Sequence, residues 1–251
     1  MFNKQSIAAI VPCYNEGPRL SKVITPLIRS KLLDEIIVVD DSSSDNSVAV
    51  LLQYDGKIKI IRHKKNLGKT AAVCTGLKQA SADCLFFLDA DLIGLQPKHI
   101  DKSIKYFFEH NLDMLIIPVR SEFLSAYTQL VGWGILATGQ RILKRKHAQN
   151  LLKHPHIGFG LEMYLNKLAT HKKWRIDTLI WKNEAKAPST PSKIKKFGLF
   201  TGLKKELKML EEVAKETDLQ DYISHYRSLV IKKSLHSNNI ADKIISYIKS
   251  L

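Results

Sequence analysis

The chain has 251 residues, of which 45% are hydrophobic and 25% charged, and this composition is typical of a globular protein with one substantial core. Its net charge of +15 is concentrated after residue 140, where 23 Lys and Arg stand against 10 Asp and Glu. This excess indicates a phosphate-bearing or anionic membrane partner, or a solvated lysine-rich surface. Basic residues interleaved with aromatic ones are scarce in this part, so we expect no nucleic-acid partner.

The first residues and the cysteines indicate a reduced, cytoplasmic protein. The start, MFNKQSIAAIVPCYNEG, has no long apolar region or cleavage site of a signal peptide, so we do not expect secretion. Cys13, Cys74 and Cys84 are widely spaced and odd in number, which is typical of buried free thiols. The uncharged stretch 123–140 is too rich in Gly, Ser, Thr and Gln for us to expect a transmembrane segment.

Alternating strand and helix patterns predict an α/β fold over the first half of the chain. Short runs rich in Ile, Val, Leu and Phe predict buried strands at 6–12, 35–41, 57–63, 84–91 and 112–119. Helical patterns lie between them, at 19–33, 47–53, 69–80 and from Pro97 onward. This order predicts an open, mostly parallel sheet flanked by helices.

Beyond residue 120 the pattern changes. We expect a helical stretch to about Lys146, a loop at 153–160, a helix at 161–170 and a strand at 174–181. KAPSTPSK at 186–193 is a structure breaker, and a basic, mainly helical extension follows it. The predicted organisation is therefore one domain at 1–185, with halves 1–95 and 96–185, and an extension at 186–251.

Polar residues end several predicted strands. Ligands of open α/β sheets bind at the carboxyl ends of the strands, and there the chain has Asp89-Ala90-Asp91. Residues two apart in an extended chain point the same way, so both carboxylates can address one Mg²⁺ or Mn²⁺ that also binds substrate phosphates. An aspartate pair that caps a turn is the structural alternative.

The segment NLGKT, at 66–70, suggests a second function. It lies between a strand and a helix and resembles the end of a P-loop, which would make the chain a P-loop-like NTPase. The full motif needs glycine at position 63, where this chain has His63. A helix that begins at Lys69 can still meet a phosphate.

Four segments in order, VPCYNEG, VVDDSSSD, NLGKTAAVCTGL and LFFLDADL, resemble family 2 glycosyltransferases with the Rossmann-like GT-A fold. The resemblance covers residues 6–95 most strongly. It implies a metal-dependent hexosyltransferase with a nucleoside-diphosphate sugar donor, whose carboxylates hold Mg²⁺ or Mn²⁺ as a Lewis acid for the leaving group. The donor-binding residues that it implies are Pro12, Tyr14, Asn15, Glu16, Asp40, Asn66, Lys69, Asp89 and Ala90, with Asp89 and Asp91 on the metal.

The branch that the chain most resembles is that of the polyprenyl-phosphate and dolichyl-phosphate mannose synthases. This likeness implies an inverting transfer to a polyprenyl phosphate, with Asp91 and Arg120 at the reaction and Arg120, Arg141, Lys193 and Lys195 as cationic clamps on phosphate. Surface Arg and Lys are the alternative for Arg141 and the lysines. An interfacial helix from Lys193 to Lys215 could hold the protein at the cytoplasmic face of a membrane, or pack on the domain.

A different acceptor would need a base. Glu162, in GFGLEMYL, is the candidate catalytic base for transfer to a soluble or protein hydroxyl, although a glutamate in a first helical turn also suits the helix dipole. His156 could complete the metal shell, or be an ordinary loop histidine. The sequence leaves open the donor base, the sugar, the acceptor, inversion or retention of configuration, and the oligomeric state.

Overall fold

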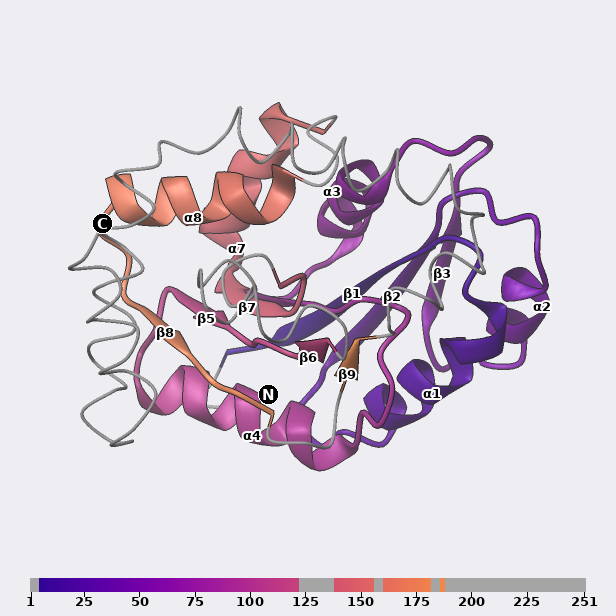
Figure 1. Cartoon of the computed structure of the whole chain (residues 1–251), viewed down its shortest axis with the longest axis horizontal. Helices are drawn as coiled ribbons and strands as arrows, with labels where there is room; N and C mark the ends of the chain where they lie inside the picture. Colours follow the sequence, from indigo (N-terminus) through magenta and orange to yellow (C-terminus); the bar gives the residue numbers. More distant parts are fainter. Residues whose placement is uncertain (1–4, 122–137, 156–159, 182–185, 188–251) are drawn as a thin grey trace, which may run out of the picture.

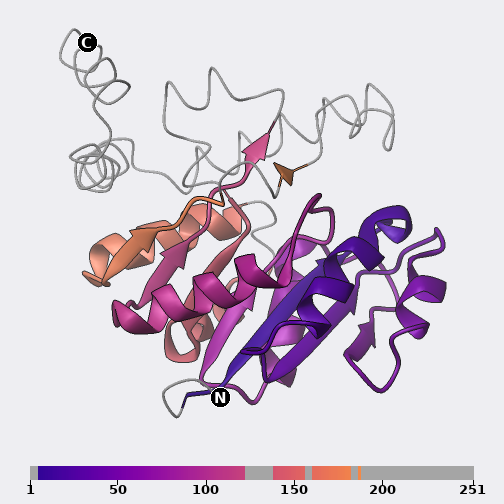
Figure 2. The same cartoon turned by 90° about the horizontal axis from the view of Figure 1, so that it is seen from below.

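A seven-stranded sheet forms the centre of the part that the computed structural model describes, which comprises residues 5–121, 138–155, 160–181 and 186–187. The strand order is β3-β2-β1-β4-β7-β5-β8. Its members are β1 (Ile7–Cys13), β2 (Glu35–Asp40), β3 (Lys59–Arg62), β4 (Cys84–Phe87), β5 (Met114–Ile116), β7 (Arg141–Lys144) and β8 (Ile176–Thr178). A second sheet pairs β6 (Arg120–Ser121) with β9 (Lys186–Ala187) beyond the upper ends of the central strands in Figure 2.

The sheet is mostly parallel, as predicted, with one reversed strand. Strands β1 to β4 pair in parallel, whereas β7 runs antiparallel between β4 and β5. The predicted helix that extends to Lys146 is therefore wrong over 141–144. Ile142 and Leu143 are both fully buried because β7 is an internal strand covered on both faces, and such a strand lacks the alternation that marks a half-exposed one.

Helices cover both faces of the sheet (Figure 1). One face carries α1 (Gly17–Ile28) and α4 (Pro97–Glu109), and α2 (Ser47–Leu52) contacts α1. The other carries α3 (Lys69–Gln79), α7 (Arg145–Ala148), the 3₁₀ helix η1 (Gln149–Lys153) and α8 (Leu161–His171). Alternate residues of β1 face the two layers, so Ile7, Ala9 and Val11 join one apolar cluster and Ala8 and Ile10 the other.

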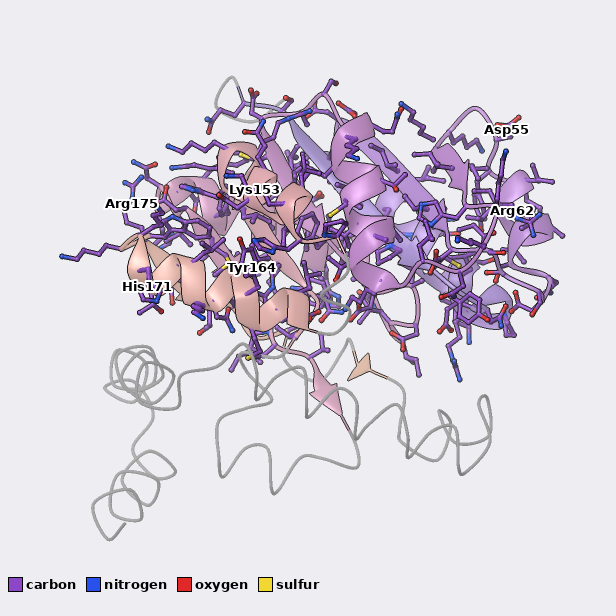
Figure 3. The ribbon with its side chains drawn as sticks, turned by 90° about the horizontal axis from the view of Figure 1, so that it is seen from above. Asp55, Arg62, Lys153, Tyr164, His171 and Arg175 are labelled. Carbon is purple, nitrogen blue, oxygen red and sulfur yellow. The ribbon has the colours of Figure 1, made fainter. Side chains whose placement is uncertain are left out.

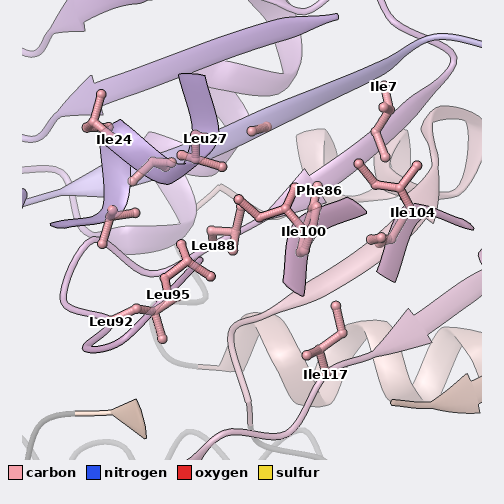
Figure 4. Close-up of a cluster of buried hydrophobic side chains, with 14 of the residues drawn as sticks. Ile7, Ile24, Leu27, Phe86, Leu88, Leu92, Leu95, Ile100, Ile104 and Ile117 are labelled. Carbon is pink, nitrogen blue, oxygen red and sulfur yellow. The ribbon is translucent and has the colours of Figure 1, made fainter. Parts of the chain in front are cut away.

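The larger apolar cluster lies beneath α1 and α4 (Figure 4). Phe86 of β4 is at its centre, with no exposed surface, and packs against Trp181 at a ring-centroid distance of 6.4 Å. The indole nitrogen of Trp181 donates to Ser103 Oγ of α4 at 2.9 Å, which joins the chain after β8 to that helix. The predicted apolar face of α4 is confirmed, since Ile100, Ile104, Phe107 and Phe108 are buried.

Element ends differ from the predictions by a few residues. Helix α1 begins at Gly17 and ends at Ile28, short of the expected Leu33. The chain leaves the helix here because Asp101 of α4 accepts hydrogen bonds from Ser30 Oγ and from the backbone N–H of Lys31. The three cysteines are buried and free, as expected. No helix among the described ranges has the length and apolar character needed to span a bilayer. The predicted helices after residue 193 lie outside those ranges.

Replacing Phe86 with alanine tests the core. We expect Phe86→Ala to lower the free energy of unfolding by about 3–5 kcal/mol, because the deleted ring leaves a cavity among fully buried neighbours. Urea unfolding followed by fluorescence measures this change. Leu52→Ala is the matched control, since Leu52 is 60% exposed and its loss should change stability by less than about 1 kcal/mol.

Candidate functional site

The strand order creates a binding edge between β1 and β4. From β1 the chain proceeds to β2 and β3 on one side, whereas β4 pairs with β1 on the other, so the connections diverge at the carboxyl ends of β1 and β4. Ligands of open α/β sheets bind at such a point. The predicted residues Tyr14 to Glu16 follow β1 here, and Asp89 to Asp91 follow β4.

Asn15 joins the loops after β1 and β2. It adopts a left-handed conformation, with φ of 55°, which asparagine tolerates better than most residues. Its Oδ1 accepts hydrogen bonds from the backbone N–H groups of Ser44 at 2.8 Å and Asp45 at 3.3 Å, and its own N–H donates to Ser43 Oγ at 2.9 Å. Asn15, which we predicted to bind the donor, therefore links the loops that follow β1 and β2.

The other predicted donor residues divide into buried and accessible ones. Asp40 has no exposed surface, and its carboxylate lies 3.2 Å from Arg62 Nε, at the β3 side of the molecule in Figure 3. Ala90 is also buried. Glu16 pairs with Arg19 at 3.3 Å. The remaining ones are half-buried or exposed: Pro12, Tyr14 and Asn66.

Asp41 fixes the start of α3, a role that the sequence interpretation missed. Its two oxygens accept the backbone N–H groups of Leu67 and Gly68, each at 2.8 Å, and His63 Nδ1 lies 2.7 Å from the same carboxylate. Gly68 has φ of +93°, a conformation that favours glycine, and the helix begins directly after it. Asp41 thereby sets the position of Lys69. The two consecutive aspartates at 40–41 could have indicated a second functional carboxylate, but only Asp40 was predicted as a site residue.

Lys69 bridges two carboxylates that come from distant parts of the chain. Its Nζ lies 2.8 Å from Asp89 Oδ1, after β4, and 2.8 Å from Glu162 Oε1, in the first turn of α8. The side chain of Glu162 is only 6% exposed, whereas that of Asp89 is 29% exposed. Burial alone would lower the pKa of Lys69, but Asp89 and Glu162 raise it well above its ordinary value. The ammonium therefore stays charged at physiological pH.

Gln140 and Gly139 complete the surroundings of Asp89. Gln140 Nε2 donates to Asp89 Oδ2 at 2.7 Å, so protein groups bind both carboxylate oxygens. A Cβ at position 139 would lie 2.5 Å from each Asp89 oxygen and 2.7 Å from Lys69 Nζ, so only glycine allows this approach. Neither residue was predicted, because both lie in an uncharged stretch expected to be helical.

Arg141 requires a correction. We predicted a clamp on acceptor phosphate, but its side chain has no exposed surface. The guanidinium donates to Thr138 O at 2.8 Å, Asn166 Oδ1 at 3.1 Å and Glu162 O at 3.3 Å. Burial lowers its pKa to about 10, against the opposing influence of Glu162 and Asp89. Arg141 thus fastens α8 to the chain that enters β7, which keeps Glu162 and Gln140 in position.

The remaining predicted cations are only partly described. Arg120 belongs to β6, where its backbone is in register with Lys186 of β9. Lys193, Lys195 and the candidate metal ligand His156 lie outside the described residues. Helix α8, with Tyr164 and His171 along it, lies at the opposite end of the molecule from Arg62 (Figure 3).

The carboxylate oxygens of Asp89 and Asp91 are suitable ligands for a hard divalent cation that phosphate oxygens also bind. Both side chains are partly exposed and stand two residues apart after β4. The described part of the chain contains no group of three His, Cys, Asp or Glu side chains arranged to hold a metal by themselves. Two carboxylates with phosphate oxygens are a usual arrangement for Mg²⁺, so the residues fit a cation bound together with a diphosphate.

Comparison with known proteins identifies the family. The model of the family described as glycosyl transferase family 2 matches residues 8–169. The chain belongs to glycosyl transferase family 2. This span extends from β1 nearly to the end of α8, so it includes Asp89, Lys69 and Glu162.

Curated relatives match less than half of the chain. The poly(ribitol-phosphate) beta-N-acetylglucosaminyltransferase TarP of Staphylococcus aureus is 30% identical over 118 residues, which are 45% of this chain and 36% of that protein. The dolichol-phosphate mannosyltransferase of Pyrococcus furiosus is 36% identical over 90 residues, 34% of this chain and 26% of that protein. The chain thus matches about a third or less of these relatives' length.

Solved structures show the same fold at low identity. A glucosyl-3-phosphoglycerate synthase from Mycobacterium tuberculosis, in complex with Mn²⁺, UDP and its product, aligns with a TM-score of 0.60 at 18% identity, covering 84% of this chain and 81% of that one. S. aureus TarS 1-349 with UDP-GlcNAc aligns with a TM-score of 0.56 at 21% identity, covering 73% and 58%. The predicted GT-A fold is confirmed.

Adding one methyl group at Gly139 tests the packing around Asp89. We expect Gly139→Ala to lower the free energy of unfolding by about 1–3 kcal/mol and to separate Lys69 from Asp89, because the new Cβ overlaps both. Urea unfolding and a crystal structure of the variant measure the two effects. Gly56→Ala is a contrasting variant, since there the strain comes from φ of +75° and a Cβ meets nothing within 4 Å, whereas at Gly139 the strain comes from the overlap alone. A variant structure that keeps both 2.8 Å contacts of Lys69 would contradict the expectation.

Proposed function

We propose that the chain transfers a hexose from a nucleoside-diphosphate sugar to an acceptor, with inversion, using Mg²⁺ or Mn²⁺ held by Asp89 and Asp91. The observation that carries the proposal is the cluster of Asp89, Lys69, Glu162 and Gln140 at the β1/β4 edge of a family 2 chain. A bound divalent cation would neutralise the charge that develops on the departing diphosphate. The Mn²⁺- and UDP-containing complex of the mycobacterial synthase supports the choice of ligands.

Residues at the edge between β1 and β4 would favour the binding of a diphosphate. Asp41 fixes the Leu67–Gly68 backbone, so α3 begins where Lys69 can reach Asp89. The amino end of a helix carries a partial positive charge and free N–H groups, which favour an anion. Pro12 and Tyr14, partly exposed after β1, would bound the nucleoside.

For the acceptor we propose a polyprenyl phosphate. An acceptor phosphate is already anionic, so it needs cationic residues around it more than it needs a base. Arg120 and Lys186 are neighbours in the β6–β9 register, beyond the ends of the strands that carry the donor residues (Figure 2). The name of the P. furiosus relative, dolichol-phosphate mannosyltransferase, supports this acceptor class. Lys193 and Lys195 stay candidates for the same task, as does the extension 186–251 for contact with an anionic membrane surface.

The position of Glu162 favours a second candidate, transfer to a hydroxyl acceptor with Glu162 as the base. Lys69 joins its carboxylate to Asp89 through two contacts of 2.8 Å, so Glu162 lies beside the proposed donor phosphates. A base within reach of the sugar could deprotonate an attacking hydroxyl. The P-loop-like NTPase has no such support, because Lys69 binds carboxylates here and the family is a glycosyltransferase family.

Donor use can be tested directly with nucleotide sugars. We expect Mn²⁺-dependent hydrolysis of at least one UDP- or GDP-sugar and none of ATP, measured as released nucleoside diphosphate. Asp91→Asn should lower the rate by about 100-fold or more, because it removes one of two charged oxygen ligands from the cation. Asp101→Asn, on the far side of the sheet in α4, is the control and should keep the rate. Hydrolysis of ATP alone would contradict the proposal.

Glu162→Gln distinguishes the two acceptors. If the acceptor is a polyprenyl phosphate, we expect the variant to retain kcat within about tenfold, because no proton needs to be removed from the nucleophile. A loss of about 100-fold or more, with donor binding unchanged, would instead identify Glu162 as the base for a hydroxyl acceptor. The measurement is initial-rate kinetics with each acceptor class, and donor affinity is determined separately by calorimetry.

A further inference from the structure

We propose that Lys69 is a built-in counter-cation of the metal site, which occupies Asp89 until donor and metal arrive together. This inference rests on the proposed function, since it concerns the cation that Asp89 and Asp91 would hold. It assigns to Lys69 an exchange between two partners, first the carboxylate of Asp89 and then the donor diphosphate.

The first step is the occupation of Asp89. Lys69 Nζ lies 2.8 Å from Oδ1, and Gln140 Nε2 donates to Oδ2 at 2.7 Å. The chain's own groups thus bind both oxygens of a residue predicted to hold the metal. Lys69 also pairs with Glu162, whose side chain is 6% exposed, so its ammonium contacts two carboxylates at once.

The second step is that the lysine and a metal ion compete for Asp89. Mg²⁺ binds carboxylate oxygen at about 2.0–2.1 Å. An ammonium that stayed 2.8 Å from Oδ1 would therefore lie within about 5 Å of an ion on the same oxygen. Two positive charges at this distance in a partly buried site repel strongly. The cluster offers no sideways room, because even a Cβ at Gly139 would come within 2.5 Å of Asp89 and 2.7 Å of Lys69.

The third step is the destination of the displaced ammonium. Lys69 is the first residue of α3, so the amino end of this helix lies beside Asp89. Its side chain keeps Glu162 as a partner when a metal binds Asp89. When a metal binds Asp89, the ammonium of Lys69 loses one of its two carboxylate partners. A diphosphate supplies a new negatively charged partner, so phosphate and metal together can replace the Lys69–Asp89 pair. The metal alone offers no such compensation. We therefore expect weak binding of metal alone and strong mutual enhancement of metal and nucleoside diphosphate.

The test compares Mn²⁺ binding by the wild-type chain and Lys69→Met. We expect Lys69→Met to bind Mn²⁺, without nucleotide, at least about tenfold more tightly than the wild type, because the competing charge is gone. Enhancement of Mn²⁺ binding by UDP or GDP should be large in the wild type and much smaller in the variant. The readouts are electron paramagnetic resonance of free Mn²⁺ and calorimetry, corrected for Mn²⁺ bound to free nucleotide. Lys78→Met, an exposed lysine of the same helix, is the control and should match the wild type.

Lys69→Met leaves the buried carboxylate of Glu162 and the half-buried one of Asp89 without their lysine and can lower stability, so a charge-balanced pair of variants provides a second comparison. Lys69→Met in a Glu162→Gln background removes one charge of each sign, and this double variant should bind Mn²⁺ at least about tenfold more tightly than Glu162→Gln alone. A lysine with only a scaffolding role predicts no gain in either comparison.

The outcomes separate this inference from the proposed function. Unchanged or weaker Mn²⁺ binding in both comparisons, or no Mn²⁺ binding by any variant, overturns the counter-cation role. If the tighter Mn²⁺ binding is found but no nucleoside-diphosphate sugar is bound or hydrolysed, the exchange at Asp89 stands and the proposed donor is wrong.

Discussion

One ion-pair bridge organises the functional edge of this protein. The ammonium of Lys69 joins the start of α3, the loop after β4 and the first turn of α8, which are far apart in the sequence. Burial of charge is unfavourable unless each charge is compensated, and here the ammonium of Lys69 contacts two carboxylates while the buried Arg141 guanidinium lies near both. The rest of the site serves this bridge. Asp41 sets where α3 begins, Arg141 holds the first turn of α8, and Gln140 orients Asp89.

The bridge also accounts for the buried polar groups of Arg141, Glu162 and Asn166 beside β7. Arg141 has no exposed surface, yet its guanidinium donates to the backbone carbonyls of Thr138 and Glu162 and to the side chain of Asn166. The desolvation penalty of a buried guanidinium offsets much of what its hydrogen bonds contribute to stability. These bonds nevertheless restrict α8 to one position relative to β7. A fixed position matters at a catalytic site, since a misplacement of about 1 Å can lower the rate about 100-fold.

Local patterns in the sequence predicted much of the fold and part of the site. The strands β1 to β4, the helices α3, α4 and α8 and the polar strand ends follow from apolar runs and capping residues that act over a few positions. The antiparallel strand β7 could not be predicted this way, because RILK is too short to show a period and its identity as a strand comes from pairing with β4 and β5. Asp89 and Lys69 were recognisable from motifs. The contact of Lys69 with Glu162 depends on how the sheet brings distant segments together, and no local rule reports it.

The reversal of β7 brings the end of β5 and the start of β7 to the same edge of the sheet. Strand β5 leaves the sheet at the edge where Asp89 lies, and β7 enters the sheet from the same edge. The backbone N–H of Ile117, just after β5, therefore donates to the carbonyl of Gln140, just before β7, at 2.9 Å. The residue that donates to Asp89 is thus held by β5 as well as by its own strand. One antiparallel strand in a parallel sheet can in this way place a polar side chain at the edge where the parallel strands end.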